Sequence, residues 1–524
     1  MREAGVLDTQ EDLINLAPLE APSLKQPEQR ASARSPVAII ARNSVFVLGV
    51  QVVLKILAFL FNVYVVRRLG AVYFGQYSAV MAYVAIFAIF TDWGMSPYAV
   101  REMAKNRKKT SWLLPNIVAI RVVLSFIITL IAPLSALWLG KENDMVLGIL
   151  IASAGLILYA FQGPLDSALA ARERLDYTSI FTLINQLVFW GLGVLLLING
   201  LGFIGLIIAS SVGVAVVALL SGWTLFKMGL GRLILSARLW PQLFLAALPF
   251  GVSGISYAFM QHFNTVLMSF VLSDAAVGWA SVPGTLIGPV MLIAQSIAIA
   301  MYPSMVRSHT ENAESLPQVV WQAIKYLLIV CLPIVVGGTV LADRIIITLY
   351  GETFANSIRV LQVMLWALPS LFLLELLGRV GSTLYLERPG ARINVINAVL
   401  TVILNLILVP TLGILGAALA MVSGVTLRLV QYWRLIGNER LVSRRWGSLL
   451  RVALAAAAMG VIVFFLHQSP TFGAMNSKVG LLALIGIGAV AYVVALLASG
   501  SIERREMEFM RKMAMERLAR GSAK

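Results

Sequence analysis

The chain has 524 residues, of which 59% are apolar and 13% charged, and its formal net charge is +16. Soluble domains carry roughly 25% charged residues, so this chain has too few polar side chains to cover a water-exposed surface of its size. The composition excludes a soluble protein and predicts an all-α polytopic membrane protein.

Common enzyme and cofactor signatures do not occur in the sequence. The single cysteine, Cys331, excludes a disulfide framework and a cysteine-ligated metal site. The patterns typical of hydrolases, zinc enzymes and nucleotide-binding proteins are missing as well. We therefore expect neither a metal nor a cofactor, and no enzymatic activity.

Residues 1–42 are polar, with four prolines and charges of both signs. Such a segment buries too little apolar surface to offset its chain entropy, so we predict a disordered cytoplasmic tail. Because the first long apolar run begins only after this tail, we do not expect a signal peptide.

The rest of the chain reads as about fourteen apolar segments, each close to the roughly 20 residues that cross a bilayer. Two junctions, Asn199–Gly202 and Thr411–Gly413, are so short that the helices beside them must form antiparallel hairpins. The predicted spans are 43–66, 76–97, 115–139, 145–166, 179–198, 203–226, 243–272, 277–303, 321–342, 361–384, 394–410, 414–433, 452–468 and 479–499.

The short loops between these spans fix the orientation of the chain. If the N-terminus is cytoplasmic, the inside loops carry 18 Lys and Arg and the outside loops carry 6. This bias predicts that both termini are cytoplasmic. We expect the basic tail 500–524 to lie along anionic lipid headgroups or to remain a solvated tail. Topology thus accounts for the positive charge, and we expect no nucleic-acid partner.

An internal repeat divides the membrane part into two halves. The pattern Leu-Gly-x2-Gly-x3-Ala-x3-Gly occurs at 201–213 and again at 412–424. It predicts two six-helix repeats, 43–226 and 243–433, followed by an extra helix pair at 452–499. Because six helices separate the repeats, both insert with the same orientation. Parallel repeats of this kind are typical of transporters, and we predict two lobes around a central cavity.

Polar residues inside the spans are candidates for a site, because lipid offers them no partners. Gln51, Lys55 and Asn62 share one stripe of the first span. Gln261 and Asn264 continue a similar stripe, which begins with Ser253 and Tyr257, in the first span of the second half. We predict that both stripes line the cavity; the alternative for Lys55 is a packing role beside a buried carboxylate.

Other charged residues in the spans leave more than one interpretation open. Glu375 and Arg379 lie four apart, where they either neutralise each other or contact a ligand. Asp92 could serve a proton relay, cap a helix or bind Arg101. Arg121 lies toward a helix end, where snorkelling to the interface is the simpler interpretation.

Within the predicted spans cationic side chains outnumber acidic ones. The excess favours an anionic ligand, because Lys and Arg bind phosphate well. We interpret Lys325 and Arg428 as snorkelling residues and Asp166 as interfacial. The five cations are Lys55, Arg121, Lys325, Arg379 and Arg428, and the three acids are Asp92, Asp166 and Glu375.

A motif over 68–104 resembles the opening of bacterial O-antigen-type polysaccharide translocases. These translocases belong to the multidrug/oligosaccharidyl-lipid/polysaccharide (MOP) exporter superfamily, together with the MATE drug antiporters and the lipid II flippase. The resemblance extends over roughly residues 40–440. The residues that carry it are Arg68, Leu69, Gly70, Phe74, Gly75, Tyr77, Ser78, Asp92, Gly94, Arg101, Glu102 and Ala104.

The resemblance implies a flippase in the bacterial cytoplasmic membrane. It would move an undecaprenyl-pyrophosphate-linked oligosaccharide to the periplasmic leaflet by alternating access, in contact with membrane lipids and with polysaccharide polymerase or export proteins as candidate partners. We expect Lys55, with Arg121 and Arg379, to neutralise the pyrophosphate. Asp92 and Glu375 are the candidates for coupling to a proton or sodium gradient. The amides expected to bind sugar hydroxyls are Gln51, Asn62, Gln261 and Asn264.

Two alternatives belong to other classes. A MATE-like drug or cation antiporter would be expected to show an unpaired carboxylate, against the positive charge found here. A membrane glycosyltransferase or polymerase would need a large outside loop with acidic or His residues. The longest predicted outside loop, 343–360, holds only Asp343 and Glu352 as acids.

Overall fold

The computed structural model describes residues 36–229, 233–311, 313–437, 446–470, 472 and 477–500. For 36–52 and a few helix ends only the backbone is described. The predicted tails 1–42 and 500–524 therefore lie almost entirely outside the described residues.

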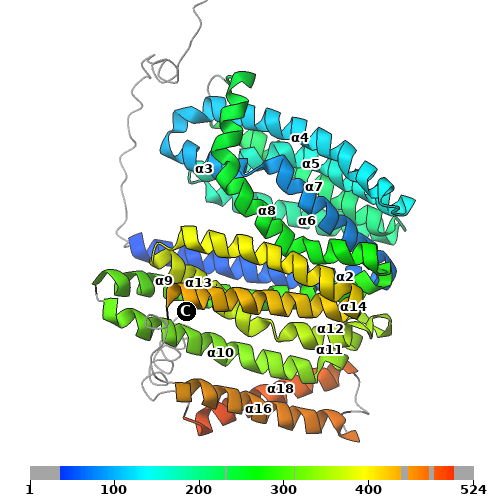
Figure 1. Ribbon diagram of the computed structural model, residues 1–524, viewed down its shortest axis with the longest axis vertical. Helices are drawn as coiled ribbons and strands as arrows, with labels where there is room; N and C mark the ends of the chain where they lie inside the picture. The colour runs from blue at the N-terminus through cyan, green and yellow to red at the C-terminus, as the bar shows by residue number, and fades with distance from the viewer. Residues whose placement is uncertain are drawn as a thin grey trace, which may run out of the picture. The chain divides into compact units, whose positions relative to one another are not determined.

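All regular elements in the described part of the chain are helices (Figure 1). The first half contains α2 (Pro36–Asp92), α3 (Met95–Lys105), α4 (Thr110–Trp138), α5 (Asn143–Ala171), α6 (Leu175–Ile198) and α7 (Gly202–Lys227). The second half contains α8 (Trp240–Val271), α9 (Asp274–Glu311), α10 (Leu316–Val340), α11 (Ala342–Tyr350), α12 (Ser357–Leu365), α13 (Leu368–Thr383) and α14 (Glu387–Ile436). The last pair is α16 (Trp446–Gln468) and α18 (Ser477–Ala498), and short 3-10 turns are η1 (Arg107–Lys109), η2 (Ala237–Leu239), η3 (Ala313–Ser315) and η4 (Glu352–Phe354).

The described residues hold 11 helices long and apolar enough to cross a membrane, or 12 if the bent pair α12–α13 is one span. The all-α polytopic prediction is confirmed, but the count of fourteen is not. The counts differ because α2 and α14 each join two predicted spans across a break, at Gly70 (φ 72°) and Gly413 (φ 59°). A straight helix of the 50 residues of α14 would measure about 75 Å, far more than the roughly 30 Å of a hydrocarbon core.

Both tight junctions fold back as predicted. A Cβ atom added at Gly416 would lie 1.8 Å from the carbonyl oxygen of Leu408, although eight residues of straight helix would separate them by about 12 Å. The two arms of α14 are therefore antiparallel neighbours. At the equivalent junction between α6 and α7, a Cβ at Gly205 would lie 2.9 Å from Leu196 Cβ. The glycines of the repeat thus allow close helix contact at both hairpins.

Packing among the described helices follows the two halves of the sequence. In the first half α5 packs against α4 and α7, and α6 packs against α7. In the second half α8 packs along α14, while α13 contacts both α9 and α14. The predicted extra pair, α16 and α18, forms a cluster of its own and rests on α10. The grouping into two lobes around a central cavity stays a prediction.

Glycines bring the backbone of α2 directly against that of α9. A Cβ atom at Gly75 would lie 1.8 Å from the carbonyl oxygen of Asp274, and one at Gly278 would lie 2.0 Å from that of Ala71. Beside this contact, Gln76 Nε2 donates a hydrogen bond to Asp274 Oδ2 at 2.8 Å. This contact joins the second predicted span to the eighth.

A second contact of the same kind lies where α2 ends. Gly94 has a left-handed backbone (φ 76°), and a Cβ added there would lie 2.3 Å from the backbone nitrogen of Gly251 in α8. In the other direction, a Cβ at Gly251 would lie 3.0 Å from the carbonyl oxygen of Trp93. The two predicted halves of the chain therefore meet through backbone atoms at two separate places.

Candidate functional site

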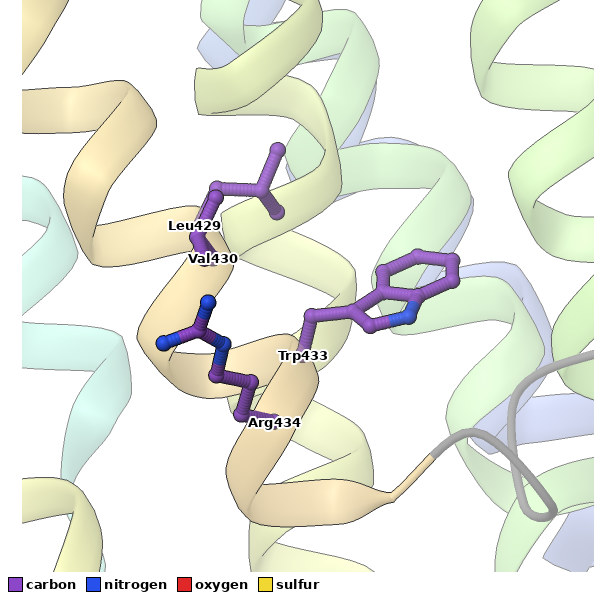
Figure 2. Close-up of a pocket in the computed structure, with 4 residues that line it drawn as sticks. All are labelled: Leu429, Val430, Trp433 and Arg434. Carbon is purple, nitrogen blue, oxygen red and sulfur yellow. The ribbon is translucent and has the colours of Figure 1, made fainter.

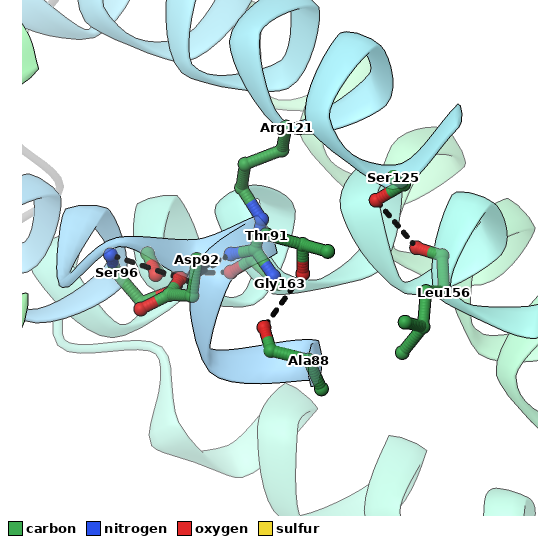
Figure 3. A network of polar contacts seen from close by, with 9 residues as sticks. Ala88, Thr91, Asp92, Ser96, Arg121, Ser125, Leu156 and Gly163 are labelled. Carbon is green, nitrogen blue, oxygen red and sulfur yellow. Dashed lines mark hydrogen bonds and ion pairs between the residues drawn. The ribbon is translucent and has the colours of Figure 1, made fainter. Parts of the chain in front are cut away.

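A buried ion pair joins the end of α2 to α4 (Figure 3). Arg121 is fully buried, and its Nη1 lies 2.7 Å from Asp92 Oδ1 and 2.8 Å from Ser96 Oγ. The Ser96 hydroxyl donates to the same carboxylate oxygen at 2.5 Å, and the Ser96 backbone N–H donates to it at 3.3 Å. Asp92 thus caps the first turn of α3 as well as pairing with Arg121.

The backbone around this pair makes room for the guanidinium. Trp93 (φ 48°) and Gly94 turn the chain sharply between α2 and α3, which leaves Asp92 at the corner. On α5, a Cβ atom at Gly163 would lie 2.6 Å from Arg121 Nη1, so a side chain there would collide with it. The Tyr159 ring, one turn earlier on α5, lies 5.4 Å from Arg121 Cζ.

These contacts correct the interpretation of Arg121 and decide between the alternatives left open for Asp92. Arg121 does not snorkel to an interface, because its side chain has 0% exposure and a buried partner. Asp92 pairs with Arg121 and caps a helix, whereas Arg101 pairs with the neighbouring Glu102 at 3.3 Å. In this arrangement the Arg121 side chain is out of reach of a ligand, so its contribution is to hold α2, α3 and α4 together.

The polar stripe of α2 has an exposed cation. Lys55 is exposed, and no ion pair or hydrogen bond to it occurs among the described residues. Asn62 is partly buried, and its Oδ1 has no hydrogen-bond partner in the described part of the chain. The side chain of Gln51 lies outside the described residues. An unpaired lysine in a membrane span is costly against lipid, so Lys55 favours a polar cavity.

The residues predicted to form one polar stripe on α8 lie in different surroundings. Gln261 is exposed, while Asn264 Nδ2 donates to the carbonyl oxygen of Ala417 in α14 at 3.2 Å. Farther toward the start of α8, Ser253 and Tyr257 line a cavity instead. The structure therefore does not place all four residues on one surface.

The cavity has a volume of about 290 Å³ and lies between α8, α13 and the two arms of α14. Arg428 is partly buried at its wall rather than simply extended to an interface, which corrects the snorkelling interpretation. No local pattern in the sequence indicates this cavity, because its polar groups come from three helical segments, α8 and the two arms of α14. These groups belong to Ser253, Ser256, Tyr257, Asn394, Arg428 and Tyr432.

The predicted pair on α13 is confirmed. Arg379 Nη2 lies 3.4 Å from Glu375 Oε1, and both side chains are partly exposed, at 36% and 25%. Arg379 also lies beside the ring of Tyr302 in α9, with 6.0 Å between Cζ and the ring centroid. Unlike Arg121, this pair is accessible from outside the protein.

A second hollow lies nearby on α14 alone (Figure 2). It measures about 300 Å³ and is lined by Leu429, Val430, Trp433 and Arg434. Three of these side chains are apolar and all four come from one helix, so the hollow offers no converging set of polar groups. Within the described residues no cluster of His, Cys, Asp or Glu could hold a metal ion.

Residues 40–309, more than half of the chain, match the family described as "Polysaccharide biosynthesis protein". The chain belongs to this family. Residues 242–484 also match the family described as "Lipid II flippase MurJ". A search of curated proteins finds no match.

Solved structures show the same fold. A lipid II flippase MurJ in an inward closed conformation is similar over 86% of this chain and 98% of that one, with TM-score 0.70 and 15% identity. An inward-facing MATE multidrug transporter of the MOP superfamily is similar over 72% and 96%, with TM-score 0.54 and 16% identity. With the family match, these shared folds agree with the predicted superfamily. The protein is a multi-pass membrane protein of the polysaccharide biosynthesis family, and it shares its fold with the lipid II flippase MurJ.

Proposed function

We propose that the protein is a flippase that moves a polyprenyl-pyrophosphate-linked oligosaccharide from the cytoplasmic to the periplasmic leaflet of a bacterial inner membrane. The family match over residues 40–309 and the fold shared with a lipid II flippase support a lipid-linked substrate. The transport supplies polysaccharide biosynthesis, and both termini of the chain lie in the cytoplasm.

The observation that carries the proposal is the exposed Lys55 on α2, which has no counter-ion among the described residues. Its ammonium has three donors and suits the oxygens of a pyrophosphate. Exposed Gln261 and partly exposed Arg379 are further groups that can reach a polar substrate.

A drug-cation exporter is less favoured, because the two coupling candidates, Asp92 and Glu375, are paired with arginines. The third acid of the spans, Asp166, bonds to Ser221 and Gln162 and is the carboxylate that a drug antiporter would use.

We assign coupling to an ion gradient to Glu375, the more accessible of the two acids paired with arginines. Glu375 is partly exposed beside Arg379, so protonation there would release the arginine toward the substrate. Asp92 is held by Arg121 and Ser96, which makes it the weaker candidate for a proton relay.

Lys55→Ala is expected to lower flipping at least about tenfold, since a charge-assisted hydrogen bond contributes roughly 1.5–3 kcal/mol. The assay follows a fluorescent polyprenyl-pyrophosphate oligosaccharide in proteoliposomes. Because Lys55 is exposed, the variant should unfold at the wild-type temperature, and Lys55→Arg should keep most of the activity.

The matched control is Lys227→Ala, which removes an exposed lysine from the last turn of α7. It should flip the substrate normally. Normal flipping by Lys55→Ala would exclude Lys55 from the path. A wild type that exchanged organic cations and moved no lipid-linked sugar would replace the flippase with a drug antiporter.

A further inference from the structure

Arg428 is a cation whose Nε donor is not satisfied by any residue that the structure describes. Its Nε is buried without a hydrogen-bond partner, and no carboxylate among the described residues lies within ion-pair distance of the guanidinium. The acid on the adjoining helix, Glu375, is already paired with Arg379. A buried charged donor without an acceptor is costly, so the cavity beside it calls for an anionic ligand. We propose that this cavity binds the phosphate group of a membrane lipid, with Arg428 as its main ligand.

Three other hydroxyls of the cavity already donate to backbone carbonyls, that of Tyr432 to Gly390 O at 3.4 Å. The Ser253 hydroxyl donates to Pro249 O at 3.2 Å, and the Ser256 hydroxyl donates to Val252 O at 2.9 Å, so neither needs a ligand acceptor. The Tyr257 hydroxyl has no partner in the described part of the chain and stands beside Arg428 as a second donor. Phosphate oxygens accept hydrogen bonds from both kinds of donor.

The depth of the cavity agrees with a lipid headgroup. Arg428 lies eight residues before α14 ends at Ile436, which is about 12 Å along a helix. Gly378 lies five residues before the end of α13 at Thr383. Arg428 is therefore nearer to Ile436 than to the break at Gly413, which lies 15 residues before it, so the cavity lies toward one side of the membrane.

The small volume and open rim of the cavity suit a single lipid headgroup. An oligosaccharide would need more space. The cavity's 290 Å³ is at the lower end of small-molecule sites, which begin near roughly 300 Å³. At the rim, Tyr257 is 63% and Val395 is 39% exposed, so the cavity is open to molecules outside the bundle. A lipid can enter with its phosphate at Arg428 and its chains against the apolar rim.

The test measures lipid binding to the full-length protein in detergent, by calorimetry and native mass spectrometry. The probes are phosphatidic acid and diacylglycerol with the same chains, which differ only in the phosphate. Phosphatidic acid should bind and diacylglycerol should not, and Arg428→Gln should weaken phosphatidic acid at least about tenfold. Equal binding of the two probes would overturn the proposal.

A second variant tests the cavity without touching its charge. A Cβ atom at Gly378 meets nothing within 4 Å, so Gly378→Leu should fill the cavity without a backbone clash and abolish binding. Gly378→Ala should bind more strongly than Gly378→Leu. The charge control is Arg434→Gln, on the same helix but outside the cavity. Wild-type affinity in both Arg428→Gln and Gly378→Leu, or an equal loss in Arg434→Gln, would contradict the proposal.

Two competitors identify the source of the phosphate. Displacement of phosphatidic acid by polyprenyl pyrophosphate would assign the cavity to the transported lipid, and its failure to compete would assign it to a resident phospholipid. Inorganic phosphate that binds as tightly as phosphatidic acid would overturn the lipid part of the proposal. Because the readout is binding, the result is independent of whether Lys55→Ala stops flipping.

Discussion

Replacing Arg121 with leucine is expected to destabilise the protein by about 3–5 kcal/mol, the range for breaking a buried ion pair by removing one partner. The change leaves the Asp92 carboxylate, whose side chain is only 23% exposed, without its counter-charge. It also removes the hydrogen bond from Arg121 Nη1 to Ser96 Oγ at the start of α3 (Figure 3). Thermal unfolding in detergent, followed by tryptophan fluorescence, measures the loss.

The matched control is Arg101→Leu, because Arg101 pairs with Glu102 while 51% of its own side chain is exposed. Exposed pairs contribute roughly 0–1 kcal/mol, so this variant should unfold close to the wild type. Removing both charges, Asp92→Asn with Arg121→Leu, should recover much of the stability. Equal unfolding temperatures for Arg121→Leu and Arg101→Leu would refute a structural role for the pair.

Adding one methyl group at Gly416 is expected to cost about 3 kcal/mol, the upper part of the range for overpacking. The new Cβ would lie 1.8 Å from Leu408 O and 2.5 Å from Leu408 C, and backbone atoms of the same hairpin cannot easily move away. Alanine is the better helix former, so any loss reports the close contact between the arms. The fraction of monodisperse protein after extraction and its unfolding temperature are the measurements.

Gly205 provides an internal comparison, because it holds the equivalent position in the first repeat. The atoms nearest to an added Cβ there are much farther away than at Gly416, with Leu196 Cβ at 2.9 Å and Leu201 Cβ at 3.0 Å, so a shift of a few tenths of an ångström relieves the contact. Gly205→Ala should therefore cost only about 1 kcal/mol. If both alanine variants lost the same stability, the backbone contact at Gly416 would not be the cause.

Features set by neighbouring residues were predictable from the sequence. The hairpins followed from junctions too short for any other path, and the Glu375–Arg379 pair followed from a spacing of four on one helix. The number of spans was harder, because helical hydrogen bonding continues on both sides of Gly70 and Gly413 and joins segments that the apolar pattern separates.

Features set by packing between distant helices were not predictable. Arg121 and Asp92 lie 29 residues apart on different helices, and no periodicity relates them. Arg428 is similar, because only the folded second half shows that α8 and α13 enclose a cavity beside it. The exposure of Lys55 agrees with its place on a polar stripe, but the stripe says nothing about which ligand it meets.

The backbone contacts between Gly75 and Gly278 and between Gly94 and Gly251 affect how easily the two halves of a transporter can separate. Helices that interdigitate through large side chains must change rotamers and uncover apolar area before they part. The glycines themselves have no rotamers to change, although the neighbouring Phe74 and Val277 are buried and would be uncovered on opening. At the contact between α2 and α9, the side-chain hydrogen bond that has to break and re-form joins Gln76 to Asp274. In the alternating access proposed above, such a contact would open with few side-chain rearrangements, and the close fit of the backbones would return the helices to the same register each time.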